Sequence, residues 1–446
     1  MSKKRKGKEK AREESNSDHD SDTIDRETLE ISSTARNPSG KNQYASTPSL
    51  QEIANILREY HKSNPDFRYA DYIDALARDH GYKIGRTKIA GYLSQLGLST
   101  SSRGNRMPKS EKTQIILDEL AKDPLQTRGP RAIKESLNLL GHKIGRGDIS
   151  DVMHDFEEEG FKKRHPRAKK KTNRTPLTAV GPDEEWSMDG HDKLNAAGFG
   201  VYGIRDKWAK KRLHYRVVPS NRYAAVVGVV FLECVKKCGG IPIQGSSDRG
   251  SEIRDAYAFQ KSLREMFAPD LLDAVVPSWM FLPSPQNITV ESGWRSLFYT
   301  WGVNVLEFYN SGLHGGFFEQ GNIVHEQTAR WIWFPVVQRS LDNFCNEQNN
   351  HRIQKQTEKL LPSGGTPNQF YSNPAKYGGK SCLIPVEEAV VDELLANCQE
   401  GHERMRYVDT AFEEIAQAAY DALEQPEITL QNAWTVFRAM IGKLEM

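Results

Sequence analysis

The chain has 446 residues and a formal net charge of +2, because 61 Lys and Arg residues nearly balance 59 Asp and Glu residues. This length predicts two or three domains, and a hydrophobic content of 37% with eight Trp is enough to build packed cores. No stretch approaches the roughly 18 apolar residues of a membrane helix, and the charged N-terminus is unlike a secretory signal. Five Cys without a CxxC pair favour free thiols over a zinc site. We therefore expect a soluble intracellular protein that does not enter a membrane.

Residues 1–46 are polar and Ser-rich and contain almost no large apolar side chain. Such a segment cannot bury enough apolar surface to offset the loss of chain entropy, so we expect it to be disordered. Within it, residues 3–12 are dense in Lys and Arg. A basic block of this kind is typical of a solvated tail, a nuclear-import signal or an arm that binds phosphate. We expect the protein in the nucleus, with the cytoplasm as the other possibility.

A second basic block covers residues 162–174, inside a predicted linker at 161–180. Lys169, Lys170 and Lys171 lie in this block and are candidate DNA-binding residues, because clustered cations neutralise backbone phosphates.

Residues 47–160 contain an internal repeat with an offset of 60 residues. The sequence Gly81-Tyr-Lys-Ile-Gly-Arg86 recurs as Gly141-His-Lys-Ile-Gly-Arg146. In each copy the apolar residues predict a first helix, a shorter second helix, and a third helix after a Gly-containing turn. This order resembles a helix-turn-helix, here in tandem. The predicted apolar positions are Ile53, Ile56, Leu57, Tyr60, Ile73, Ala77, Ile89, Tyr92, Leu93 and Leu96 in the first copy, and Ile115, Ile116, Leu120, Ile133, Leu137, Ile149, Val152, Met153 and Phe156 in the second.

The two copies differ in charge in the third helix. Arg86 and Lys88 begin this helix in the first copy, where helix-turn-helix proteins contact bases or phosphates. The second copy carries acidic residues that would repel a phosphate backbone. These are Asp148, Asp151, Asp155, Glu157, Glu158 and Glu159. We therefore expect DNA contact from the first copy rather than the second, and plain helical bundles that bind another protein are the alternative.

Residues 181–372 alternate apolar strands and helices in the order of a ribonuclease-H-like α/β core, with a five-stranded mixed sheet and flanking helices. Predicted strands cover 184–190, 199–206, 212–219, 241–247 and 275–282, and predicted helices cover 222–238, 251–267 and a segment that begins near Asn287. Residues 373–446 are expected to form a helical C-terminal extension.

Three acidic residues in this core have settings that suit them to metal chemistry. Asp189 lies at a strand end in Trp186-Ser-Met-Asp189, and Asp248 follows a strand in Ser247-Asp248-Arg-Gly250. Glu291 lies one turn inside a helix. Carboxylates that converge from such positions can bind Mg²⁺ or Mn²⁺ through oxygen beside a phosphodiester. Nearby Glu252 is interpreted as a turn or helix N-terminal charge, and His191 as a structural residue.

These segments resemble the catalytic core of retroviral-type integrases and DDE transposases, and more specifically the integrase-core proteins encoded in eukaryotic genomes. The family pattern is a Trp-x-x-Asp strand, a Ser-Asp-x-Gly-x-Glu turn and an Asn-x-x-x-Glu-x-x-Trp-Arg helix. The third motif reads Asn287-Ile-Thr-Val-Glu291-Ser-Gly-Trp294-Arg295. Downstream, Asn349-Asn-His-Arg352 and Gly365-Thr-Pro367 resemble the segment that closes such cores, so the likeness covers about residues 180–372. The chain differs in a longer Asp-to-Glu spacing and in helical repeats where retroviral enzymes have a zinc module.

The resemblance implies that Asp189, Asp248 and Glu291 are catalytic and hold two Mg²⁺ or Mn²⁺ ions. It also implies that Arg295 and Asn287 contact DNA. The implied function is that of a polynucleotidyl transferase derived from a mobile element, which cuts and joins DNA without a small-molecule cofactor. Its partners would be element ends, target DNA and a second copy of the chain, since joining paired ends requires at least a dimer.

Two other functions are compatible with the residues. The chain could be a domesticated DNA-binding protein whose core no longer cuts, although all three acidic residues are present. It could also be a scaffold in which the helical repeats and the Trp-rich helices bind proteins.

Overall fold

The computed structural model describes residues 47–65, 67–98, 100, 107–156, 178–282, 288–357 and 360–445, with the backbone alone at 288, 289 and 291. The tail at 1–46, most of the linker at 161–180 and Asn287 therefore lie outside the described residues, as do Lys169, Lys170 and Lys171. From Pro48 onward the chain forms one compact unit.

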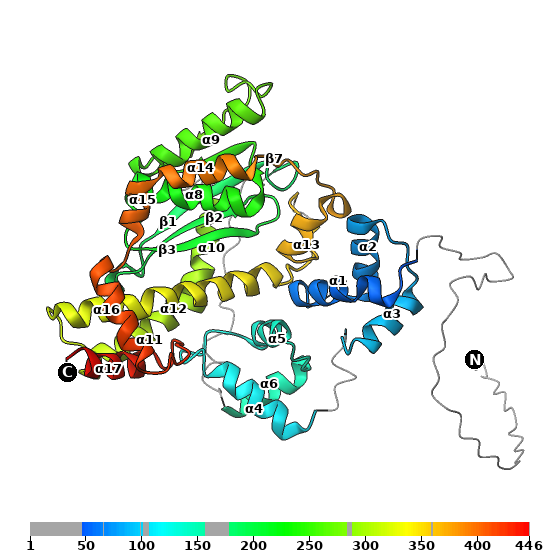
Figure 1. Ribbon diagram of the computed structural model, residues 1–446. Helices are drawn as coiled ribbons and strands as arrows, with labels where there is room; N and C mark the ends of the chain where they lie inside the picture. The colour runs from blue at the N-terminus through cyan, green and yellow to red at the C-terminus, as the bar shows by residue number, and fades with distance from the viewer. Residues whose placement is uncertain are drawn as a thin grey trace, which may run out of the picture. The chain divides into compact units, whose positions relative to one another are not determined.

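In the described part of the chain, two groups of three helices precede the sheet (Figure 1). The first group is α1 (Leu50–Ser63), α2 (Tyr69–His80) and α3 (Arg86–Gln95), and the second is α4 (Lys109–Leu120), α5 (Pro130–Leu139) and α6 (Arg146–Phe156). Each group has a core of its own: Ile53, Leu57 and Ile89 are buried in the first, and Ile133 and Ile149 in the second. The region before the sheet is therefore all-helical, as predicted.

The repeated motif has the same structural role in both groups. Gly81 ends α2 with a φ of +69°, and Gly141 follows α5 with a φ of +88°, a conformation that favours glycine. The Ile of each motif, Ile84 and Ile144, is buried. The third helices α3 and α6 then begin at the Arg that ends each copy. The motif thus ends the second helix of each group, contributes a buried Ile to the core and begins the third helix.

The apolar face of α2 differs from the prediction. Tyr72 and Leu76 are buried, whereas Ile73 is only half-buried and Ala77 is exposed. The Tyr72 ring buries more apolar surface than Ala77 could, so the buried face of α2 is shifted by one residue from the predicted face. Phe156, at the end of α6, is likewise exposed rather than buried. The predicted positions in α5 are buried.

The central sheet has five strands in the order β3-β2-β1-β5-β6. They are β1 (Glu185–His191), β2 (Gly200–Asp206), β3 (Arg212–Val218), β5 (Gln244–Ser247) and β6 (Trp279–Phe281). β1, β2 and β3 pair antiparallel, whereas β5 pairs parallel with both β1 and β6. This is the mixed sheet of a ribonuclease-H-like fold, and the predicted fold class is confirmed.

One predicted strand is divided in two. The segment 241–247 forms β4 (Gly240–Ile241), which pairs with β7 (Ile384–Pro385) in a separate two-stranded sheet, and β5 in the central sheet. Pro242 lies between them and has no N–H to donate to a ladder, so it interrupts the pairing.

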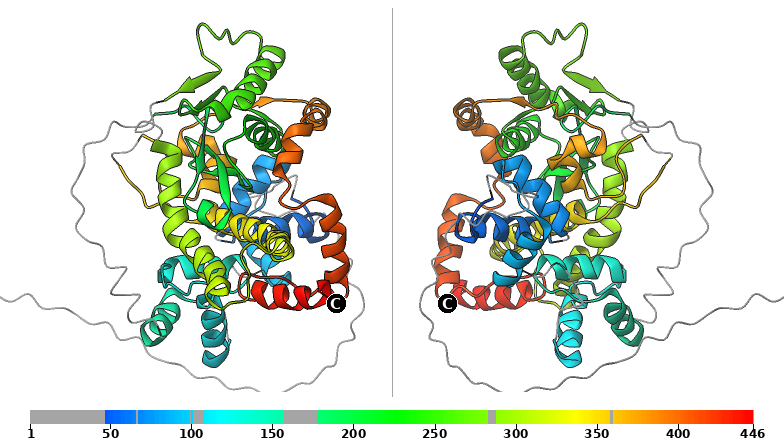
Figure 2. Two further views of the ribbon diagram at one scale, coloured as in Figure 1. Left: turned by 90° about the vertical axis from the view of Figure 1, so that its left-hand side faces the viewer. Right: turned by 90° about the vertical axis from the view of Figure 1, so that its right-hand side faces the viewer.

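Helices cover both faces of the central sheet (Figures 1 and 2). On one face, Trp186, Met188 and Ile204 pack against α8, together with α9, α14 and α15. On the other face lie α10, α11 and α12. A π-helical turn at Phe298–Gly302 joins α10 to α11 without a break. The bounds are α8 (Ala224–Cys238), α9 (Arg254–Phe267), α10 (Ile288–Leu297), α11 (Val303–His314), α12 (Ile323–Asn350), α13 (Pro367–Ser372), α14 (Glu388–Asn397), α15 (Gln399–Met405), α16 (Thr410–Asp421) and α17 (Ala433–Leu444). None of the helices in the described ranges has the length and apolar character needed to cross a bilayer.

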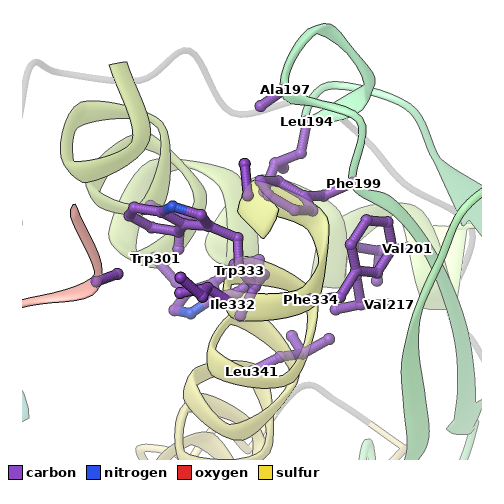
Figure 3. Close-up of a cluster of buried hydrophobic side chains, with 14 of the residues drawn as sticks. Leu194, Ala197, Phe199, Val201, Val217, Trp301, Ile332, Trp333, Phe334 and Leu341 are labelled. Carbon is purple, nitrogen blue, oxygen red and sulfur yellow. The ribbon is translucent and has the colours of Figure 1, made fainter. Parts of the chain in front are cut away.

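The long helix α12 forms the centre of the core on this second face. Figure 3 shows Trp333, Phe334 and Leu341 of α12 in one cluster with Val201 of β2 and Val217 of β3. All five side chains are buried. The helix thereby fixes one face of the antiparallel half of the sheet.

The C-terminal helices complete the same core. Trp434 of α17 donates its Nε1–H to the carbonyls of Phe308 and Tyr309, each at 3.0 Å. Its ring centroid lies 5.3 Å from that of Trp333, and a Cβ at Gly312 would fall 2.1 Å from the Trp434 ring. The predicted helical extension therefore packs as part of the core rather than around a core of its own.

A group of buried charges joins the second helical group to α12. Arg128, before α5, donates to Glu119 of α4 at 2.8 Å and to Glu347 of α12 at 3.2 Å. The Ser136 Oγ of α5 also lies within hydrogen-bond distance of both carboxylates, at 2.6 and 2.9 Å, and can donate its one proton to either. The side chain of Glu119 is 2% exposed and that of Arg128 is 11% exposed. Desolvation raises the pKa of Glu347, and Arg128 acts in the opposite direction.

Arg128→Met should lower the free energy of unfolding by about 3 kcal/mol, because two largely desolvated carboxylates would lose the cation between them. The loss should appear in urea denaturation and as faster hydrogen exchange of the α4–α6 amides.

Lys122→Met is the matched control. Lys122 contacts the same Glu119 at 2.8 Å, but its side chain is 49% exposed, so its loss should cost at most about 1 kcal/mol. Equal losses in the two variants would contradict the role of burial.

Candidate active site

Strand register places two of the three predicted acidic residues side by side. β1 and β5 run parallel, with Glu185 opposite Gln244 and Ser187 opposite Ser246. Two residues further along each chain, Asp189 is level with Asp248, just beyond the end of β5. Neighbouring strands are about 4.8 Å apart, so both half-buried carboxylates lie at one edge of the sheet.

Asp189 also contacts the helix that carries Glu291. Its Oδ2 accepts a hydrogen bond from Trp294 Nε1 on α10 at 2.9 Å, and its Oδ1 accepts one from the Gly190 N–H at 2.9 Å. Trp294 lies one turn after Glu291 on the same side of the helix. Close approach of α10 requires a glycine in β2, since a Cβ at Gly203 would fall 2.6 Å from the Trp294 ring.

The structure places Glu291 on α10 by its backbone, beside the buried stripe of Val290, Trp294 and Leu297. Its side chain lies outside the described part. Among the side chains that are described, no three His, Cys, Asp or Glu residues form a group that could hold a metal ion. Arg295 is exposed on α10, and the predicted contact at Asn287 falls outside the described residues.

A third described carboxylate lies near this edge. Burial raises the pKa of Tyr202 in β2 well above its usual value, and the charges of Asp189, Glu252 and Asp248 raise it further. Glu252 also folds over Gly250, where an added Cβ would fall 2.0 Å from a Glu252 carboxylate oxygen. From the sequence, Glu252 is interpreted as a turn or helix N-terminal charge and is not counted among the site residues. It does lie in the first turn of a short 3-10 helix at Ser251–Ile253.

His191, at the end of β1, supports the site rather than facing solvent. Its ring stacks on Trp294 with centroids 4.9 Å apart, and the residue is buried. Desolvation and then the charge of Lys193 lower the pKa of His191 to about 4, against a smaller opposing effect of Asp192. The imidazole is therefore neutral at physiological pH. Its Nε2 has no hydrogen-bond partner among the described residues.

The candidate DNA contacts of the first helical group are exposed. Arg86 and Lys88 lie in the first turn of α3, as predicted. The Arg86 guanidinium lies 5.8 Å from the Tyr69 ring centroid, and the Lys88 ammonium lies 5.7 Å from that of Tyr92. No contact within the described ranges joins them to Asp189 or Asp248.

A comparison with known protein families agrees with the ribonuclease-H-like fold of the central sheet. Residues 178–375 match the family described as integrase core domain. Residues 178–375 are an integrase core domain. Members of this family are usually metal-dependent polynucleotidyl transferases, and an integrase core implies DNA binding in general. No curated protein matches the chain.

Replacing His191 should change the pH dependence of stability. Its pKa is about 4 when folded and near 6.5 when unfolded, so its contribution is complete above pH 6.5 and is lost as the pH falls toward 4. From pH 7 to pH 5, the native chain should lose about 2 kcal/mol more free energy of unfolding than His191→Phe.

Urea denaturation in metal-free buffer measures this difference. The same substitution at exposed His314 controls for the loss of an imidazole. Parallel stability curves for the native chain and His191→Phe would mean that the pKa of His191 is the same in the folded and the unfolded chain.

Proposed function

We propose that this integrase-core protein is a polynucleotidyl transferase that cuts and joins DNA with two divalent metal ions. Asp189, Asp248 and Glu291 would hold Mg²⁺ or Mn²⁺. The observation that carries the proposal is the β1–β5 register, which brings Asp189 and Asp248 to one edge. The Trp294 hydrogen bond to Asp189 supports the inclusion of Glu291, one turn away on α10.

The residues present suit such ions. Carboxylate oxygens are the ligands that hard divalent cations prefer, and the half-buried edge limits competition from solvent. Bound metal would lower the pKa of a nucleophilic water or hydroxyl and stabilise the leaving oxygen. Trp294 orients Asp189 from behind through its N–H, as groups outside the ligand set commonly do. Arg295, which is exposed and next to Trp294, would hold a backbone phosphate.

The wider biology belongs to the same proposal. Hydrolysis would free a 3′-OH on an element end, and that hydroxyl would attack target DNA. Two ends would require at least two copies of the chain. A mobile-element origin and a nuclear location fit a DNA-joining protein with basic blocks at 3–12 and 162–174.

Purified chain should nick duplex DNA in the presence of Mn²⁺, and Asp248→Asn should reduce the rate at least about 100-fold, because an amide replaces a charged metal ligand. Supercoiled plasmid relaxation measures the rate. Asp270→Asn, the same substitution at an exposed loop position, should retain activity.

The other outcomes separate the alternatives. DNA binding without nicking by any of these proteins would favour a domesticated DNA-binding protein. Absence of both nicking and DNA binding would favour a protein scaffold.

A further inference from the structure

A cavity of about 920 Å³ lies between the two helical groups and the segment that follows α12. Arg68 comes from the first group, Lys134 and Arg146 from the second, and Arg352 and Lys355 from the segment after α12. Among the described residues, eight cationic side chains line the cavity, against two carboxylates. The walls are therefore strongly positive in a chain whose net charge is only +2.

Direct contacts hold the walls of the cavity together. Arg131 of α5 donates to the carbonyl of Arg352, and Lys143 donates to the carbonyl of Pro65. Lys376, in a short 3-10 turn after α13, contacts Asp74 of α2 at 2.9 Å. The three segments thus enclose the hollow through contacts of their own.

Three of the eight cations are engaged in this way. Arg131 also contacts Glu135 at 3.2 Å, and Lys376 also contacts Asp71 at 3.4 Å. In the described part of the chain, Glu135 and Asp71 are the two carboxylates that line the cavity. They are therefore already paired with cations of the wall.

The other five cations have no ion pair with any described carboxylate. They are Arg68, Lys134, Arg146, Arg352 and Lys355. Lys134 is half-buried and the other four are exposed. Like charges gathered around a hollow repel one another, and a polyanion placed among them would relieve this repulsion.

The acidic residues of the second helical group do not oppose an anion here. Asp148, Asp151 and Asp155 of α6 are not among the described residues that line the cavity. Asp148 instead contacts Lys112 of α4 at 3.3 Å. The second group faces the cavity with α5, with Lys143 in the turn after it and with the first residue of α6, so the acidic residues of α6 are not part of this wall.

We infer that this cavity is a docking site for the phosphate backbone of duplex DNA. Duplex DNA carries one negative charge per about 1.7 Å of its axis, so a cluster of this density can neutralise several phosphates at once. Arg side chains suit phosphate because their planar donors contact two oxygens together. The inference rests on the proposed function only in taking DNA as the partner, and it assigns binding to residues other than Asp189, Asp248 and Glu291.

The test is the salt dependence of binding of the full chain to a fluorescent duplex, measured by anisotropy with EDTA to prevent cutting. Arg352→Ala/Lys355→Ala should reduce the slope of log K against log salt by roughly 1.8, about 0.9 per contact. At 0.1 M salt this corresponds to roughly 50-fold weaker binding. Lys134→Ala/Arg146→Ala, on the facing wall, should give a similar loss.

Lys109→Ala/Lys443→Ala is the matched control, because it removes the same charge from exposed positions outside the cavity. Circular dichroism should be unchanged, since the altered side chains are solvent-accessible. Wild-type slopes in both cavity variants, or an equal loss in the control, would overturn the inference. If no protein nicks DNA but the cavity variants still lose binding, the proposed function fails and the docking site stands.

Discussion

Parallel pairing of β1 with β5 is the constraint on which the candidate active site depends. Parallel strands cannot be joined by a tight turn, and here the chain passes through β2, β3 and α8 before it returns to the sheet. This crossover brings Asp189 and Asp248 to the same edge from distant parts of the sequence. The Trp294 hydrogen bond then fixes α10 against that edge, with Gly203 leaving room for the indole.

The packing around the sheet explains why the edge is held firmly. Trp333 and Phe334 of α12 lie in the same buried cluster as residues of the sheet. Trp333 also packs against Trp434 of α17. Glu347 of α12 forms an ion pair with Arg128 of the second helical group. One helix therefore connects three parts of the chain that the sequence presents separately. Trp333 and Glu347 lie 14 residues apart on α12, about 21 Å along the helix axis, so the two contacts can be destabilised separately.

Charge is segregated in this protein although its totals nearly cancel. Carboxylates gather where β1 and β5 end, and cations gather between the helical groups and the segment after α12. Gathering like charges costs electrostatic free energy unless counter-ions or a charged ligand offset it. A divalent cation has the charge that would offset this cost at the carboxylates. A phosphate backbone has the charge that would offset it at the cations.

The sequence by itself determined the local elements and the fold class. The bounds of β1, β2, β3, α8 and α9 follow the apolar pattern closely, since each segment must bury one face, whereas β6 covers only Trp279–Phe281 of the strand predicted at 275–282. The repeated glycines mark helix ends because glycine adopts a positive φ at the least cost. Asp189 and Asp248 could be singled out because strand ends are recognisable. Only the tertiary structure decided the rest. It placed Glu252 near the acidic edge, buried Tyr72 in place of Ala77, and turned α5 rather than the acidic α6 toward the basic cavity. These features depend on which face of an element meets a distant neighbour, and periodicity within one segment carries no information about that neighbour.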